Sequence, residues 1–161
     1  MKQSLLVLFG LLLFPLNPEA TAEGRECFDM DSVACEVFHR TNHERASAGL
    51  PALAYNGGCF RMAQDQSEDM LARGYFSHRR PATGNAPGES FTERAKRFGL
   101  KNWIGENIAR NGNAAGVVGR WMNSPGHRKN ILNPKYNSFG VGYREGYYTQ
   151  VFWRDPSLAK K

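Results

Sequence analysis

One segment near the end of the chain, residues 147–153, carries bulky side chains on both of its alternating faces. In an extended conformation, successive side chains point to opposite sides of a sheet. One series here is Tyr147, Thr149, Val151 and Trp153, and the other is Tyr148, Gln150 and Phe152. A strand with two packable faces predicts a sheet that is covered on both sides.

The rest of the chain supplies further strands and the helices to cover them. Residues 139–144 join 147–153 through Glu145-Gly146, a two-residue hairpin turn, and residues 103–109 are also predicted to be extended. Apolar periodicity and helix-end signals predict helices over 31–48, 59–73, 90–99 and 114–123, with a short helical turn restarting at Ser124. The predicted fold class is therefore α+β, a small and mainly antiparallel sheet between helical layers.

Residues 1–22 have the composition of a secretory signal peptide. Lys2 is a short positive region, Leu5 to Phe14 form an apolar run, and Ala20-Thr21-Ala22 is a cleavage signal. The apolar run is too short to span a bilayer, and no later segment approaches its length. We therefore expect a secreted protein, extracellular or periplasmic, with no transmembrane span after cleavage.

The chain is basic, with a formal net charge of +6. A basic secreted domain favours anionic partners, such as wall polymers, lipopolysaccharide or acidic lipids. The alternative is a charge that only keeps the protein in solution. Basic residues are scattered and match no nucleic-acid-binding motif, so nucleic acid is not an expected partner.

The predicted mature chain contains three cysteines, Cys27, Cys35 and Cys59. An oxidising compartment favours one disulfide and leaves one odd thiol. We expect Cys59 to pair with Cys35 or Cys27, because either bridge would join the N-terminal segment to the core. The sequence leaves both pairings open.

Two ionisable residues stand in apolar surroundings. Glu106 shares one face of a predicted strand with Ile104 and Ile108, where a carboxylate needs a cation, a metal or several N–H donors. The competing interpretation is a structural glutamate bonded to backbone amides. His78 stands at the mouth of the loop 79–89, where it can be a ligand, a general base or a hydrogen-bonded cap.

A third ionisable residue, His127, follows Ser124 and Pro125, a favourable N-cap and first helical residue. Near the N-terminus of that turn the helix dipole favours a neutral imidazole, the form that binds metals or accepts protons. The competing interpretation is a residue that only shapes a tight corner. In one shared cleft, His78, Glu106 and His127 would form a zinc or general-base set.

Other catalytic patterns have less support. His39 and His43 are spaced to clamp a metal on one helix, but Arg40 stands where a zincin has its glutamate, and we expect both to face solvent. No G-x-S-x-G motif is present, and no cysteine has a papain-like context.

Several short motifs resemble the bacterial branch of the CAP superfamily, which comprises cysteine-rich secretory proteins, antigen 5 and plant pathogenesis-related proteins. In chain order they are Asn42-x-x-Arg45 with Ala48-Gly-Leu-Pro51, Tyr75-Phe-Ser-His78, Gly105-Glu-Asn-Ile108, Trp121 with Ser124-Pro-Gly-His127 and Asn130-Ile-Leu132, and Tyr148-Thr-Gln-Val-Phe152. The resemblance implies a three-layer α-β-α sandwich, which agrees with the layers predicted above. The expected division is a signal peptide (1–22), an N-terminal segment (23–34), the CAP domain (35–153) and a basic C-terminal tail (154–161).

The resemblance also implies a site. In many CAP proteins two histidines and two glutamates line a central cavity that can bind a divalent metal such as zinc. His78 and Glu106 match two of these positions, whereas the other two are Ser124 and Tyr147 in this chain. His127, typical of the bacterial branch, can substitute for the missing histidine. The expected cleft is lined by all five residues, with His78 and His127 as zinc ligands.

We therefore expect a secreted, non-enzymatic module that binds a ligand or partner, for example a lipid or an anionic wall polymer. The alternative is a metal-assisted hydrolase of peptide or cell-wall bonds, with zinc on His78 and His127 and Glu106 as general base. A third possibility is a structural secreted domain whose polar cluster only holds the loops together.

Overall fold

The structure, a computed structural model, describes residue 27 and residues 29–158. The predicted signal peptide, the start of the N-terminal segment and the last three residues of the tail lie outside the described residues. The elements in chain order are α2 (Ser32–Ser47), β1 (Ala54–Tyr55), α3 (Gly57–Arg73), α4 (Phe91–Arg97), β2 (Ile104–Arg110), α5 (Ala114–Asn123), α6 (Pro125–Ile131), β3 (Ser138–Arg144), β4 (Tyr147–Trp153) and the 3₁₀ turn η1 (Pro156–Leu158). No helix in this part of the chain is both long and apolar enough to cross a membrane.

The four strands form one sheet in the order β1-β3-β4-β2. β3 and β4 are the predicted antiparallel hairpin, and β2 pairs antiparallel with β4 so that Glu106 lies opposite Val151. β1, which the sequence analysis did not predict, pairs parallel with the start of β3. This order makes β2 an edge strand, and that position is decisive for the candidate site.

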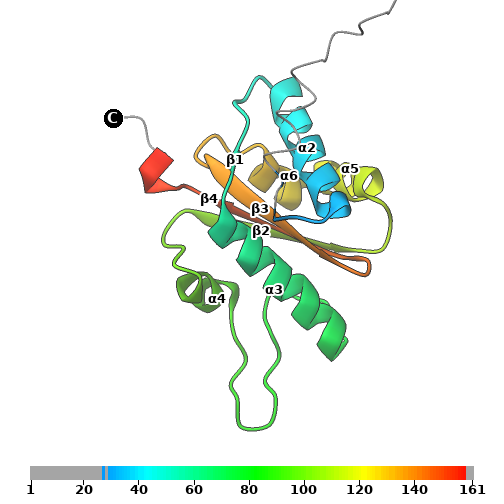
Figure 1. The fold of residues 1–161 in the computed structure, drawn as a ribbon, viewed down its shortest axis with the longest axis vertical. Helices are drawn as coiled ribbons and strands as arrows, with labels where there is room; N and C mark the ends of the chain where they lie inside the picture. The colour runs from blue at the N-terminus through cyan, green and yellow to red at the C-terminus, as the bar shows by residue number, and fades with distance from the viewer. Residues whose placement is uncertain (1–26, 28, 159–161) are drawn as a thin grey trace, which may run out of the picture.

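Helices cover both faces of the sheet (Figure 1). α3 and α4 lie on one side, and α2, α5 and α6 lie on the other. Each side has its own apolar core: Tyr148 and Phe152 of β4 enter the core under α2 and α5, whereas Val151 enters the core with α3 and α4. The prediction of a sheet covered on both sides, in a three-layer α-β-α sandwich, is confirmed.

Side-chain caps fix where the helices begin. The oxygens of Asp31, Asn56 and Asn113 accept from the backbone N–H three residues later, at 2.8 to 3.0 Å. Ser90 and Glu93 form the predicted capping box at the start of α4. These bonds satisfy amides that the first helical turn leaves free. The start of α4 is thereby fixed, and with it the position of Arg94.

The disulfide prediction is wrong. Cys27 pairs with Cys35, and Cys59 is a free, fully buried thiol. A turn in which Met30 N–H donates to the carbonyl of Cys27 at 2.8 Å precedes α2, and the disulfide joins Cys27 to the first turn of that helix at Cys35. Cys59 instead points into the core under α3, where burial raises the pKa of its thiol.

Candidate functional site

The centre of the candidate site is a buried ion pair between Glu106 and Arg94. Glu106 lies on β2 with its side chain only 2% exposed, and Arg94 on α4 is fully buried. The Arg94 guanidinium donates to Oε2 of Glu106 at 2.6 Å. The sequence analysis predicted that this carboxylate needs a partner, and the partner is a protein cation.

His78 completes this cluster from the loop after α3. Its Nδ1 lies 2.9 Å from Oε1 of Glu106, and its side chain is half exposed. Two backbone contacts hold the loop: Gln66 donates to the carbonyl of Ser77 at 2.8 Å, and Arg94 donates to that of His78 at 3.3 Å. His78 is therefore the solvent-facing member of a three-residue charge cluster.

His127 belongs to the opposite layer of the molecule. It is the third residue of α6, which packs with α5 and against β2. The neighbour of Glu106 on β2, Asn107, points to this side, where its Nδ2 donates to the His127 carbonyl at 3.2 Å and to Gln150 Oε1 at 3.1 Å. Because adjacent strand residues face opposite ways, Glu106 and Asn107 point to opposite sides of the sheet, and His127 is linked through its backbone to the Asn107 side.

Stability should depend on pH through His127. Burial, and secondarily the charge of His78, lowers the pKa of His127 from its usual 6.5. Below pH 6.5 the imidazole of His127 binds a proton in the unfolded chain, whereas in the folded chain its lower pKa keeps it neutral. The free energy contributed by the neutral imidazole is therefore present above that pH and lost as the pH falls toward the lower folded pKa.

The measurement is urea unfolding at about pH 7.5 and about pH 5.5, on either side of the usual histidine pKa. We expect His127→Asn to lose less stability over this interval than the wild type. His43→Asn, which removes an exposed imidazole of α2, should keep the wild-type difference. Equal differences for wild type and His127→Asn would contradict the assignment.

The donor set does not fit the expected zinc site. In the described part of the chain, His78, Glu106 and His127 are not among the residue groups whose ligand atoms all lie within 4.8 Å of one another. Both Glu106 oxygens are already paired, one of them with a guanidinium whose charge would repel a nearby cation. We therefore derive no chemistry through a metal at this place.

The two remaining cleft residues make no hydrogen bond or ion pair with Glu106 among the described residues, and Tyr147 lies apart from it along the sheet. Ser124 ends α5 and stands at the N-cap of α6, but its side chain makes no capping hydrogen bond. Tyr147 opens β4 opposite Arg110, on the same face of the sheet as Glu106 but four residue pairs away. At about 3.3 Å per residue, this places it roughly 13 Å along the strand. The single cleft with five lining residues stays a prediction.

A second cluster does bring three metal-type ligands together. The ligand atoms of Cys27, Cys35 and His39 lie within 4.8 Å of one another, and His39 Nε2 is 3.3 Å from the sulfur of Cys27. The two sulfurs are joined in a disulfide. Because a metal would require both as thiolates, the oxidised protein has no metal site here. The sequence analysis expected His39 to face solvent and missed this contact.

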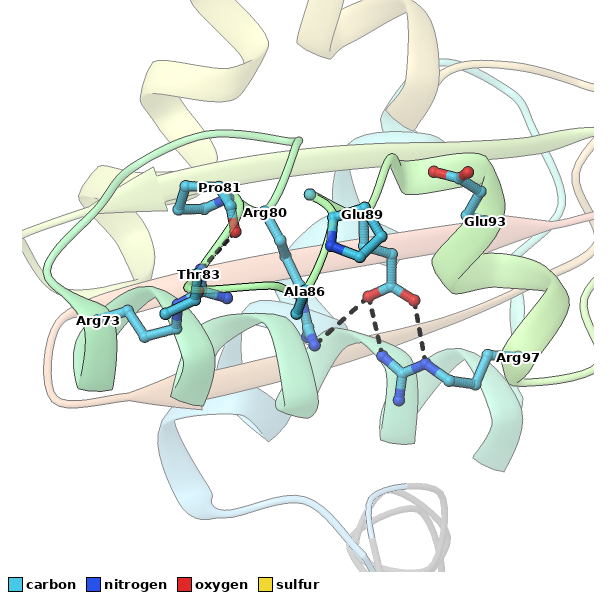
Figure 2. A pocket seen from close by; sticks show the side chains of 10 residues that line it. Arg73, Arg80, Pro81, Thr83, Ala86, Glu89, Glu93 and Arg97 are labelled. Atoms are coloured by element: carbon cyan, nitrogen blue, oxygen red, sulfur yellow. Dashed lines mark hydrogen bonds and ion pairs between the residues drawn. The ribbon is translucent and has the colours of Figure 1, made fainter.

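A pocket of about 500 Å³ opens between the loop 80–89 and helices α3 and α4 (Figure 2). Its cations are neutralised by neighbouring carboxylates: Arg97 lies 3.1 Å and Arg80 lies 3.5 Å from Glu89, and Arg80 also lies 2.7 Å from Asp65. These ion pairs tie the loop to the two helices. The pocket therefore offers little uncompensated charge to a ligand.

The sequence analysis missed the residues that hold the site together. No sequence pattern indicated that Arg94 is buried, because an arginine in a helix is normally exposed. A pattern could have indicated Asn107, since a polar residue between buried neighbours on a strand needs hydrogen-bond partners. Its Oδ1 accepts from Asn130 at 2.9 Å, while Gln150 continues the network by donating to Thr41 at 2.6 Å.

The fold and these polar clusters can be compared with known proteins. A model of the cysteine-rich secretory protein family, CAP, matches residues 38–153. The chain belongs to the CAP family. The matched residues include the His78–Glu106–Arg94 cluster and the Asn107 network.

Bacterial relatives share the CAP domain. The chain is 40% identical over 121 residues to YkwD of Bacillus subtilis (strain 168), covering 73% of this chain and 45% of YkwD. It is 38% identical over 120 residues to the membrane protein YlbC of the same organism, covering 73% and 33%. An extracellular SCP-domain protein from Bacillus anthracis str. Ames superposes with a TM-score of 0.68 at 35% identity, over 74% of this chain and 39% of that one. The chain thus spans less than half the length of each relative.

Proposed function

We propose that this CAP domain is a secreted, non-enzymatic module that binds a ligand or partner in the cell envelope. The observation that carries the proposal is the state of Glu106, the best candidate for a general base. A base must come within hydrogen-bond reach of a substrate or water proton. Both Glu106 oxygens instead pair with protein nitrogens, at 2.6 and 2.9 Å, in a side chain that is 2% exposed.

The same contacts assign the cluster a positioning role. Arg94 links α4 to β2 through Glu106 and holds the backbone of His78. The cluster thus fixes the loop after α3 against the sheet, as a scaffold does for binding loops. Three features support secretion: the Cys27–Cys35 disulfide, which suits an oxidising compartment, the signal-type composition of residues 1–22, and the extracellular B. anthracis relative.

The test compares the mature protein with His78→Ala, His127→Ala and Glu106→Gln. Each is equilibrated with zinc, freed of excess metal and analysed for zinc content, then incubated with peptides and with peptidoglycan. We expect zinc well below one per chain in the wild type, no decrease in either histidine variant, and no cleavage by any of the proteins.

The opposite pattern would establish the hydrolase. It consists of one zinc per chain that is lost in both histidine variants, together with cleavage that Glu106→Gln abolishes. Arg73→Lys is the control for effects of substituting any charged residue, because Arg73 lies in the charged pocket of Figure 2 and outside the His78–Glu106–Arg94 cluster. It should behave as the wild type in both assays.

A further inference from the structure

Three neighbouring pockets surround the loop between α4 and β2. They share lining residues: Trp103 lines the first and second, and Lys101 with Asn102 line the second and third. Their volumes are about 660, 580 and 380 Å³. The first extends over α6 and the connection to β3, and the second extends over the end of β4. Together they form one continuous region, here called the Trp103 surface.

The Trp103 surface carries cations and no carboxylates. No residue that lines these three pockets is acidic, and six are basic: Lys96, Lys101, Arg128, Lys129, Lys135 and Arg154. All six are exposed, and none of them lies within 4.0 Å of a carboxylate oxygen of the described residues. The Trp103 surface differs in this from the pocket of Figure 2, whose arginines are all paired with carboxylates.

A strained backbone holds Trp103 in the solvent. Asn102 and Trp103 have φ angles of 56° and 40°, a conformation that is costly for a bulky side chain. The loop is anchored on both sides: Arg154 N–H donates to the Trp103 carbonyl at 3.1 Å, and the indole of Trp153 donates to that of Lys101 at 3.0 Å. Trp103 is nevertheless 50% exposed.

Exposed apolar groups gather near these cations. Among the described residues, only Phe76, Trp103 and Leu158 are large hydrophobic residues left exposed. Leu158 is 47% exposed and belongs to η1, whose first residue, Pro156, lines the second pocket with Trp103. The ammonium of Lys135 lies 4.0 Å from the Trp103 ring, a cation–π contact. Aromatic, aliphatic and cationic groups are thus presented together.

We propose that the Trp103 surface docks onto the headgroup region of an anionic phospholipid bilayer. Tryptophan is favoured at the boundary between headgroups and acyl chains, and lysines and arginines near an anionic leaflet are attracted to it. A soluble polyanion would use the six cations, but it offers no apolar phase in which a tryptophan and a leucine held in water could be buried. The proposal rests on the proposed function, because it gives the binding module a partner.

The test is co-sedimentation with vesicles of equimolar phosphatidylcholine and phosphatidylglycerol, against vesicles of phosphatidylcholine alone. We expect binding to the anionic vesicles, weakened by salt because exposed charges are screened, and little binding to the neutral ones. Lys101→Glu and Lys135→Glu should each lower the partition coefficient at least about fivefold, the equivalent of about 1 kcal/mol per cation near an anionic membrane.

The matched control is Arg144→Glu, which makes the same change in net charge at the far end of β3, outside the three pockets. It should leave the partition coefficient within about twofold, since its charge lies beyond a Debye length from the bound membrane. Trp103→Asn removes the indole with a residue that accepts a positive φ. We expect it to weaken vesicle binding even at high salt.

Two results would overturn the proposal. Equal losses for Lys135→Glu and Arg144→Glu would mean that net charge alone drives binding. The second result is that Trp103→Asn binds vesicles with unchanged affinity and that a soluble glycerol-phosphate polymer displaces the protein from them. It would assign the surface to a wall polymer instead. Neither result affects the zinc and cleavage assays, so failure of the docking surface and failure of the non-enzymatic function are distinguishable.

Discussion

Replacing Arg94 by methionine is expected to lower the free energy of unfolding by about 3–5 kcal/mol, the usual loss when one partner of a buried ion pair is removed. Arg94 is fully buried and lies 2.6 Å from Glu106, whose side chain is 2% exposed. Without the guanidinium, the carboxylate keeps only the half-exposed His78 as a side-chain hydrogen-bond partner. The measurement is urea unfolding followed by far-UV circular dichroism.

Two further variants separate the ion pair from the packing of α4. The double variant Arg94→Met/Glu106→Leu should recover at least about 2 kcal/mol of the loss, because replacing both partners of a buried pair by apolar residues is often neutral or stabilising. Lys96→Met, on an exposed position of the same helix, should change stability by less than about 0.5 kcal/mol. A double variant as unstable as Arg94→Met would show that packing of the arginine stem dominates.

Most of the architecture could be predicted because it depends on local signals. The alternating faces of residues 147–153 determine which residues of β4 reach each core, and the two-sided sheet follows from them. The capping box at Ser90 and Glu93 places the start of α4. β1 could not be found in this way, because its two residues have no periodicity and pair with β3 only in the folded chain.

The cysteine pairing failed for a related reason. Which thiols meet depends on the path of the chain before α2, and the turn at Cys27 to Met30 reverses the chain there so that Cys27 meets Cys35. Cys59 faces a core that is assembled from distant segments of the chain. Composition and compartment indicate that one disulfide forms, but they carry no information on such a reversal.

The candidate site was predicted in part. Period-two alternation correctly placed the side chain of Glu106 on a buried face, and the expected need for a partner was met. The same rule puts Asn107 on the other face, with His127 and α6. The sequence could not assign α6 to a layer, because that depends on the order of strands in the sheet. The structure therefore places Glu106 and Asn107 in polar clusters on opposite faces of β2, and the single cleft that the motifs indicated stays a prediction.

Substitution of Gly142 by alanine should be nearly as damaging as loss of Arg94, at about 3 kcal/mol, the upper part of the usual range for overpacking. A Cβ at this position of β3 would collide with the backbone of Ala63 and Gln64 in α3, which cannot yield as a flexible side chain would. The helix would have to move off the sheet. It carries Gln66, which holds the loop at Ser77 through a 2.8 Å hydrogen bond, so the shift would also loosen His78.

The matched control is Gly119→Ala in α5, where an added Cβ meets no atom within 4 Å. Since alanine favours a helix over glycine by about 1 kcal/mol, this variant should be at least as stable as the wild type. Unfolding in urea gives both stabilities, and hydrogen exchange of the amides at residues 77–80 reports on the loop. A Gly142→Ala protein of wild-type stability, or one destabilised without faster exchange there, would mean that the close packing of α3 on β3 does not position His78.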